Sequence, residues 1–317
     1  MDMANTIGKL AARAVLLLTA ALMAACAPPE EDDYIPFVTA EEAFLGLVVA
    51  LEEGDPVTLG RLLGPGSDEL ISSGDPVADK AGREAFLAAY REKHKLVPDG
   101  DDRQVLVIGA QDWPVPIPAV RKEGRWRLDG AAGADELIYR RVGANELGAI
   151  AVARGFVDAQ REYAAEARDG NPAGVFAQKL LSDPDQQNGL YWPTADDEAP
   201  SPAGPFVAAA GAEGYRRGGE GQRVPYHGYY YRPLFGQGPA ANGGAMNYFV
   251  DGLLTQGFAL IAWPATYGVS GVKTFIVNQD GVVYEKDLGD DTATLVGAIQ
   301  DFDPDSSWTP VVDAPGA

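Results

Sequence analysis

The sequence predicts an α+β protein with two small domains, the second of which is a long helix packed on an antiparallel β-meander. Two observations favour this class. Apolar residues at helical spacing give way, twice along the chain, to short runs rich in valine, isoleucine and aromatic residues. The length of 317 residues and the hydrophobic fraction of 46% are also sufficient for two domains, each with its own core.

Residues 1–25 have the pattern of a signal peptide. Lys9 and Arg13 precede an uncharged apolar run over residues 14–25, which is too short to cross a bilayer because a spanning helix needs about 20 residues. Residues 22–25 (Leu-Met-Ala-Ala) lead into Cys26, the only cysteine of the chain. This order resembles the bacterial lipobox, which implies lipidation of Cys26. The alternative is an ordinary signal peptide cut after residue 25.

A lipid group on Cys26 makes the membrane the first expected partner, because two or more acyl chains attach a protein stably to a bilayer. Residues 26–35 are rich in proline and acidic side chains and are predicted to form an extended tether. Ala27 resembles the sorting signal of outer-membrane lipoproteins. We therefore expect a protein of the cell envelope, held at the outer membrane and facing the periplasm.

The first domain is predicted over residues 36–130. Thr39 and Glu42 form a capping box at the start of a helix. Asp55-Pro56 and Asp75-Pro76 mark two further helix starts, with aspartate as N-cap and proline in the first turn. The third helix is expected to carry Phe86, Leu87, Tyr90 and His94 on one face. Short strands are predicted at residues 104–109, 119–122 and 125–129.

The second domain is predicted over residues 131–308, and residues 309–317 are predicted to form a tail. The chain is expected to be exposed from residue 303 onward. The long helix of this domain is expected to start at Asn145 and to be terminated by residues 169–172 (Asp-Gly-Asn-Pro). Shorter helices are predicted at residues 175–181, 205–212 and 295–299. The predicted meander consists of strands at residues 227–235, 248–252, 258–264, 273–278 and 282–287.

Aromatic residues of the second domain are the candidate binding site. In a strand, Tyr229 and Tyr231 face one side and Tyr230 the other, so one face offers a stacking platform for sugars or peptides. The alternative is a core face with a cross-strand ladder. His227 is either a general base or a structural residue. The structural role is favoured because no serine or cysteine nucleophile pattern lies near it. The candidates are Tyr191, Trp192, Tyr226, His227, Tyr229, Tyr231, Trp263 and Tyr267.

Composition argues against several classes of function. The net charge of −21 opposes nucleic-acid binding, because phosphate backbones repel an acidic partner. Two histidines and one cysteine leave too few ligands for most zinc centres. A calcium loop starting at Asp301 would need glycine where Ser306 stands and glutamate where Val312 stands. No metal, cofactor or catalytic residue is therefore predicted.

Several aromatic segments resemble one bacterial family, catalogued as domain of unknown function 2950, over about residues 36–310. They include IGAQDWPVPIP, GRWRLD, NELGAIAVARGFVDAQREYA, YHGYYYR and GFALIAWPATYGVSGVKTFIVNQDGVVYEKDLG. The resemblance implies no activity. The second domain is also similar, in the order of its elements, to the globular heads of type IV pilins and pseudopilins.

Three functions remain open at this level. The first is a non-enzymatic envelope lipoprotein that binds or scaffolds an envelope protein or glycan. The second is an enzyme acting on cell-wall or glycan material, with carboxylates in an aromatic cleft. The third is a pilin-like head that serves secretion or assembly.

Overall fold

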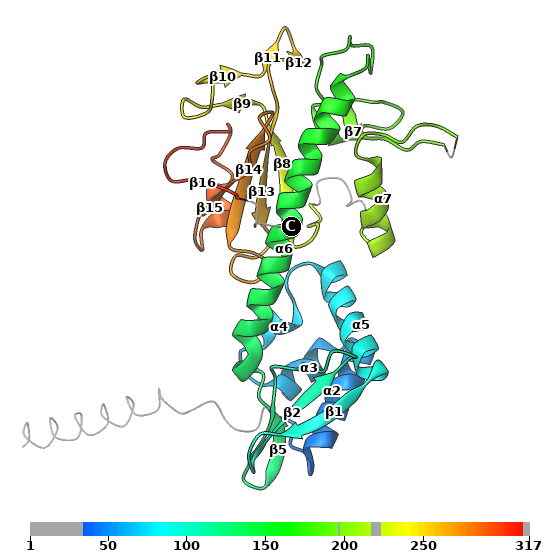
Figure 1. The fold of residues 1–317 in the computed structure, drawn as a ribbon, viewed down its shortest axis with the longest axis vertical. Coiled ribbons are helices and arrows are strands. Elements are labelled where there is room, and N and C mark those ends of the chain that lie inside the picture. Colours follow the sequence, from blue (N-terminus) through cyan, green and yellow to red (C-terminus); the bar gives the residue numbers. More distant parts are fainter. Residues whose placement is uncertain (1–33, 196, 217–222, 313–317) are drawn as a thin grey trace, which may run out of the picture.

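The computed structural model describes residues 34–195, 197–216 and 223–312. The predicted signal peptide, Cys26 and residues 313–317 of the predicted tail lie outside this part. Two lobes are connected by one long helix, α6 (Ala131–Ala164), which runs through both of them in Figure 1. The predicted α+β class is confirmed, because both lobes combine helices with antiparallel sheets.

The helices of the N-terminal lobe begin where the capping residues predict. The Thr39 hydroxyl accepts a hydrogen bond from the Glu42 amide, and the Glu42 carboxylate accepts one from the Thr39 amide in return. Asp55 and Asp75 cap the next two predicted helices, each followed by proline. The helices are α2 (Ala40–Glu53), α3 (Pro56–Leu63), the short, unpredicted α4 (Asp68–Ile71) and α5 (Pro76–Glu92).

An antiparallel sheet completes this lobe, in the order β1-β2-β4-β5, with β3 paired to β2. Its strands are β1 (His94–Pro98), β2 (Arg103–Ile108), β3 (Trp113–Pro114), β4 (Ala119–Lys122) and β5 (Arg125–Leu128). The placement of His94 on the third helix is wrong, because His94 starts β1. Its ring still stacks on Tyr90, and its Nδ1 lies 2.9 Å from the Tyr90 carbonyl oxygen at the end of α5.

The C-terminal lobe has the predicted meander of consecutive antiparallel neighbours, β8-β13-β14-β15-β16. Helix α6 packs across β13 and β14, and Ala149, Ala153, Phe156 and Val157 join the core there. The sheet strands are β8 (Tyr229–Leu234), β13 (Ala259–Pro264), β14 (Lys273–Asn278), β15 (Tyr284–Asp287) and β16 (Thr309–Pro310).

Helix α6 starts at Ala131, so its predicted start at Asn145 is wrong. Asn145 and Glu146 look like a capping signal, but their side chains instead bind the backbone at and just before the start of β14 in the C-terminal lobe. The Asn145 side-chain amide donates to the Ser270 carbonyl at 2.9 Å, and the Glu146 carboxylate accepts from the amides of Val272 and Lys273. The first part of α6 packs on the N-terminal core through Leu137. The predicted domain boundary at residue 131 stays a prediction.

Four further local predictions are corrected. Residues 175–181 are extended rather than helical, because the side chain of buried Gln160 both donates to and accepts from the backbone of Ala177. Residues 248–252 lie in a separate hairpin of β11 (Phe249–Val250) and β12 (Leu253–Leu254). The closing helix α8 spans Thr292–Leu295. The predicted tail pairs as β16, and Trp308 and Val311 pack on the core.

The remaining short elements flank the meander. They are β6 (Lys179–Leu181), β7 (Gly189–Tyr191), α7 (Gly204–Glu213), β9 (Gly236–Gln237) and β10 (Met246–Asn247). The helix α7 confirms the prediction for residues 205–212. No helix among the described residues is long and apolar enough to cross a bilayer.

Candidate functional site

A pocket of about 980 Å3 lies between α6 and α7. We call it the α6–α7 pocket. Helix α6 presents Val152, Gly155, Phe156 and Ala159 to it, at the spacing of one helical face. Helix α7 presents Phe206, Val207, Ala210 and Gly211 from the opposite side. The floor consists of Leu260 and Tyr231 from the sheet, and the parallel pair β6 and β7 closes one end with Leu180, Leu181, Leu190 and Tyr191.

Helix α7 stands apart from the core, and this separation creates the pocket. It is among the most apolar segments of the lobe, yet none of its residues is buried. In Figure 1 it lies beside α6 without crossing the sheet. It comes very close to α6 at Gly155, where a side-chain Cβ would stand 2.0 Å from the Phe206 ring. Glycine at that position therefore lets Phe206 reach α6, while the rest of α7 stays at the rim of an apolar space.

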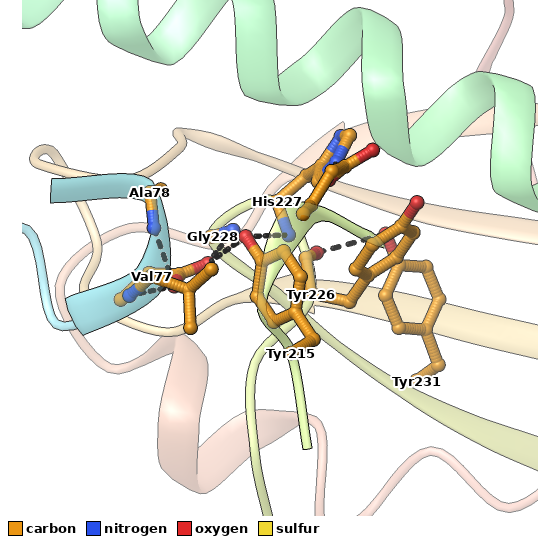
Figure 2. Close-up of polar contacts among 9 residues, drawn as sticks. Val77, Ala78, Tyr215, Tyr226, His227, Gly228 and Tyr231 are labelled. Carbon is orange, nitrogen blue, oxygen red and sulfur yellow. Dashed lines mark hydrogen bonds and ion pairs between the residues drawn. The ribbon is translucent and has the colours of Figure 1, made fainter. Parts of the chain in front are cut away.

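Polar groups are few in this pocket, and the surroundings of two of its phenols disfavour their ionisation. Burial raises the pKa of Tyr231, and burial together with the nearby Glu213 raises that of Tyr226. The Tyr231 hydroxyl donates to the Tyr226 carbonyl at 3.4 Å, as the dashed line in Figure 2 marks. Asp183 is the one carboxylate among the described lining residues, and it forms an ion pair with Lys179.

One buried carboxylate ties this site to the N-terminal lobe. Asp75 is only 1% exposed. Its Oδ1 caps α5 by accepting from the amides of Val77 and Ala78, both at 3.1 Å. Its Oδ2 accepts from the Tyr215 hydroxyl at 2.8 Å and from the Gly228 amide at 2.9 Å. Figure 2 shows these donors, from α5 on one side and from the C-terminal lobe on the other, converging on one point.

A tight turn positions the two donors from the C-terminal lobe, the Gly228 amide and the Tyr215 hydroxyl. Tyr226 and Tyr229 exchange backbone hydrogen bonds, and the residues between them, His227 and Gly228, have φ of 50° and 73°. Glycine suits the turn because a Cβ at residue 228 would stand 2.4 Å from the Asn145 amide nitrogen. The His227 Nε2 lies 2.6 Å from a Glu213 carboxylate oxygen, and the His227 amide donates to the Tyr215 hydroxyl.

The structure brings only part of the predicted aromatic site together. Tyr191, Tyr226 and Tyr231 line the α6–α7 pocket, and His227 lies in the adjoining turn. Trp192 packs edge-on against Tyr163 instead.

The other predicted aromatic residues have separate surroundings. Tyr229 is fully buried and donates to the Lys273 carbonyl. Trp263 is also buried and packs on Tyr230. Tyr267 donates to Asp287 at the end of β15. No single aromatic platform is formed by these residues in the described part of the chain.

Sequence reasoning missed Phe206, Val207, Ala210 and Tyr215 as site residues. Their helix was predicted, but a run of Phe-Val-Ala-Ala-Ala has no periodicity that separates a pocket face from a solvent face. Asp75 was identified only as a helix start, which explains one of its two oxygens. The lining residues of the pocket come from segments more than 100 residues apart, so no local signal reports them.

The site can bind an apolar molecule, and among the described residues few titratable side chains line it that could act in acid–base chemistry. Its walls are mainly aliphatic and aromatic, and its two charged lining residues are engaged elsewhere: Asp183 pairs with Lys179, and Arg216 donates to the carbonyls of Gly211 and Tyr215. His227 lies 2.6 Å from Glu213 and does not line the cavity. In the described residues, no group of three or more histidine, cysteine, aspartate or glutamate side chains is arranged to hold a metal ion.

Fold and site together define a two-lobed α+β protein with a large apolar pocket between two helices. Residues 35–311 match the family described as protein of unknown function (DUF2950), so the chain belongs to this family. No curated protein and no solved structure matches the chain. The resemblance of the second domain to pilin heads therefore stays a prediction.

Proposed function

We propose that this protein is a lipid-anchored protein of the bacterial cell envelope whose C-terminal lobe binds a neutral, lipid-like molecule in the α6–α7 pocket. The observation that carries the proposal is the volume of that pocket, about 980 Å3, together with its apolar walls. Ligand pockets in proteins typically measure about 300–1,000 Å3 and are lined mainly by hydrophobic and aromatic side chains.

Acyl chains are the ligand chemistry that fits best. Each methylene removed from water contributes about 0.8 kcal/mol, so affinity should rise roughly fourfold per methylene as long as the pocket has room. The neutral phenols of Tyr226 and Tyr231 offer hydrogen bonds without a charge, which suits a hydroxyl or ester head.

Fluorescence of N-phenyl-1-naphthylamine, a neutral apolar dye, tests the binding site. The dye should bind saturably and be displaced by 1-alkanols in order of increasing chain length. Ala210→Phe fills the pocket from α7 and should weaken dye binding by about tenfold or more. Ala208→Phe is the matched control, because Ala208 lies exposed on the same helix and does not line the pocket. Equal effects of the two substitutions, or no saturable binding at all, would exclude the pocket as a ligand site.

The anchor is tested separately. Cys26 lies outside the described residues, and its role rests on the lipobox pattern. Cys26→Ala should move the protein from the membrane fraction to the soluble fraction, or block its processing. Unchanged fractionation would end the lipoprotein interpretation without affecting the pocket.

A glycan-acting enzyme is the second candidate, and one observation favours it. A cavity of about 550 Å3 beside β15 is lined by Trp308 together with Asp287, Asp301 and Asp303. Two of these carboxylates already hold loops, since Asp287 accepts from the Gly289 amide and Asp303 from the Ala240 amide. Release of reducing sugar from peptidoglycan that is lost in Asp301→Asn, but kept in the exposed control Asp290→Asn, would establish this alternative.

A further inference from the structure

A second cavity lies in the N-terminal lobe, between α5 and α6. We call it the α5–α6 pocket, and its volume is about 380 Å3. Helices α2 and α3 form its floor, α5 and α6 its two sides, and residues around β3 its end. Its apolar walls include Leu47, Leu51, Leu59, Leu63, Phe86 and Ile117. It shares no lining residue with the α6–α7 pocket.

Charged side chains line this cavity in a positive excess, in a chain whose net charge is −21. They are Asp79, Arg83 and Arg141. The carboxylate of Asp79 is already engaged, because it accepts hydrogen bonds from the amide and the hydroxyl of Ser73. Arg141 donates to the backbone carbonyls of Glu69 and Leu70 at 2.7 and 3.0 Å. Burial lowers the pKa of Arg141, and the nearby Asp79 and Glu69 oppose that shift.

Arg83 differs from these neighbours. It is half-buried at the pocket, and within the described part of the chain it has no hydrogen bond and no ion pair. Trp113 adds a second unused donor. Its indole Nε1 is buried without a hydrogen-bond partner among the described residues, although its ring is covered by the guanidinium of Arg140 at 5.4 Å. A buried donor without an acceptor, such as the Trp113 Nε1, is unfavourable, and the half-buried Arg83 has all its donors available; an acceptor supplied by a ligand would bond to these groups.

We propose that the α5–α6 pocket binds a small carboxylic acid with an apolar body, whose carboxylate pairs with Arg83 and whose body packs among the leucines. A carboxylate fits better than a cation because the only acidic lining residue is already bonded. A single negative charge fits better than a phosphate dianion because one arginine, not a cluster, is unpaired. The inference does not depend on the function proposed for the other lobe.

Isothermal titration of the purified full chain tests this inference with three ligands that share a ten-carbon body: decanoate, decan-1-ol and decyltrimethylammonium. Decanoate should bind about tenfold or more tightly than decan-1-ol, and the cation should bind least. Arg83→Gln should remove the preference for decanoate and leave the affinity for decan-1-ol unchanged. Arg91→Gln is the matched control, because Arg91 lies on the same helix and pairs with Glu52 away from the pocket.

A filling variant gives an independent test. Gly82 lines the pocket from within α5, and no atom lies within 4 Å of where its Cβ would stand. Gly82→Leu should therefore fill the cavity and reduce decanoate binding by about tenfold or more, while the better helix propensity of leucine keeps the protein folded. Thermal unfolding of the variant verifies that fold.

Three outcomes of these titrations would overturn the inference, and a fourth comes from a variant of the other pocket. They are equal affinity for decanoate and decan-1-ol, a preference that survives Arg83→Gln, and equal losses in Arg83→Gln and Arg91→Gln. The same titration in Ala210→Phe separates the two pockets. Decanoate binding should persist there, and its loss would show that the acid occupies the α6–α7 pocket, which would overturn this inference and leave the proposed function standing.

Discussion

Replacement of Asp75 by asparagine probes how the two lobes are connected. The carboxylate of Asp75 accepts from four donors, two in α5 and two in the C-terminal lobe. Asparagine has nearly the same shape and is an equally good N-cap, so the substitution changes the hydrogen-bonding pattern and the charge but little else. Its oxygen can face the α5 amides only if its NH2 group faces the Gly228 amide, and two donors then oppose each other.

The magnitude follows from this mismatch. One buried amide left without an acceptor costs about 1–3 kcal/mol. The remaining hydrogen bonds to Asp75 lose their ionic character, and charged hydrogen bonds contribute about 1 kcal/mol more each than neutral ones. The Tyr215 hydroxyl can rotate and accept from the new NH2 group, which offsets part of the loss. We expect Asp75→Asn to reduce the free energy of unfolding by about 3 kcal/mol.

Urea unfolding, followed by tryptophan fluorescence, measures this loss. The matched control is Asp55→Asn, because Asp55 is also an aspartate N-cap before proline, but its carboxylate accepts hydrogen bonds from its own helix alone among the described residues, at Val57 and Thr58. That substitution should shift the transition far less. Equal shifts in the two variants would refute the reasoning, since the shared N-cap would then account for the whole effect.

Tyr215→Phe tests the same connection from the other side. It removes one donor from Asp75 and the acceptor of the His227 amide, so it should cost about 1–3 kcal/mol. The double variant with Asp75→Asn should lose less than the sum of the two single losses, by roughly 0.5–3 kcal/mol, because both substitutions break one network. Strict additivity would show that the two residues act independently.

Three further outcomes are expected. Gly143→Ala should raise the free energy of unfolding by about 0.5–1 kcal/mol, because Gly143 lies inside α6 with open space where a Cβ would stand. Gly271→Ala should lower it by about 1–3 kcal/mol, because its Cβ would stand 2.1 Å from the Tyr229 hydroxyl. Asp112→Asn should lower the melting temperature near neutral pH and lose this effect in acid. Hydrogen bonds from Lys93 and Lys95 hold the pKa of Asp112 below its ordinary value of 3.8, so the stabilisation is present above 3.8 and disappears as the pH falls through the lower folded-state pKa.

Urea titrations report the two glycine substitutions, and melting curves from neutral pH to about pH 2 report the third. A destabilised Gly143→Ala or a neutral Gly271→Ala would contradict the packing around them. A melting-temperature difference for Asp112→Asn that does not change with pH would contradict the ionic contribution of the two lysines.

Some elements of the fold could be predicted because their signals are local. The side chains of Thr39, Asp55 and Asp75 cap their helices by accepting hydrogen bonds from amides within three residues. The identities of a few neighbouring residues therefore decide where these helices start. The strand at residues 273–278 was predicted at its observed limits, because aromatic and β-branched residues such as Thr274, Phe275, Ile276 and Val277, bounded by turn residues, are typical of a strand.

Other elements were mispredicted because distant contacts decide them. Residues 175–181 have apolar spacing compatible with a helix, yet Gln160 of α6 binds the Ala177 backbone and holds it extended. The start of α6 was missed because glycines interrupt the pattern before Asn145. One of them, Gly133, must be glycine because the Pro116 backbone packs against it: a Cβ at residue 133 would stand 2.5 Å from the Pro116 carbonyl oxygen. Such a glycine breaks a sequence pattern without breaking the helix.

The sequence by itself determined the α+β class, the starts of α2, α3 and α5, the antiparallel meander and the family. Capping and strand alternation depend on residues only a few positions apart, so a short stretch of sequence is enough to predict them. Only the tertiary structure decided that Asp75 joins the lobes, that Tyr191 and Tyr231 reach one pocket while Tyr229 is buried, and that Arg83 is left unpaired beside a cavity. Those properties depend on packing between segments far apart in the chain, where burial and unpaired hydrogen-bonding groups, rather than local propensity, set the free energy.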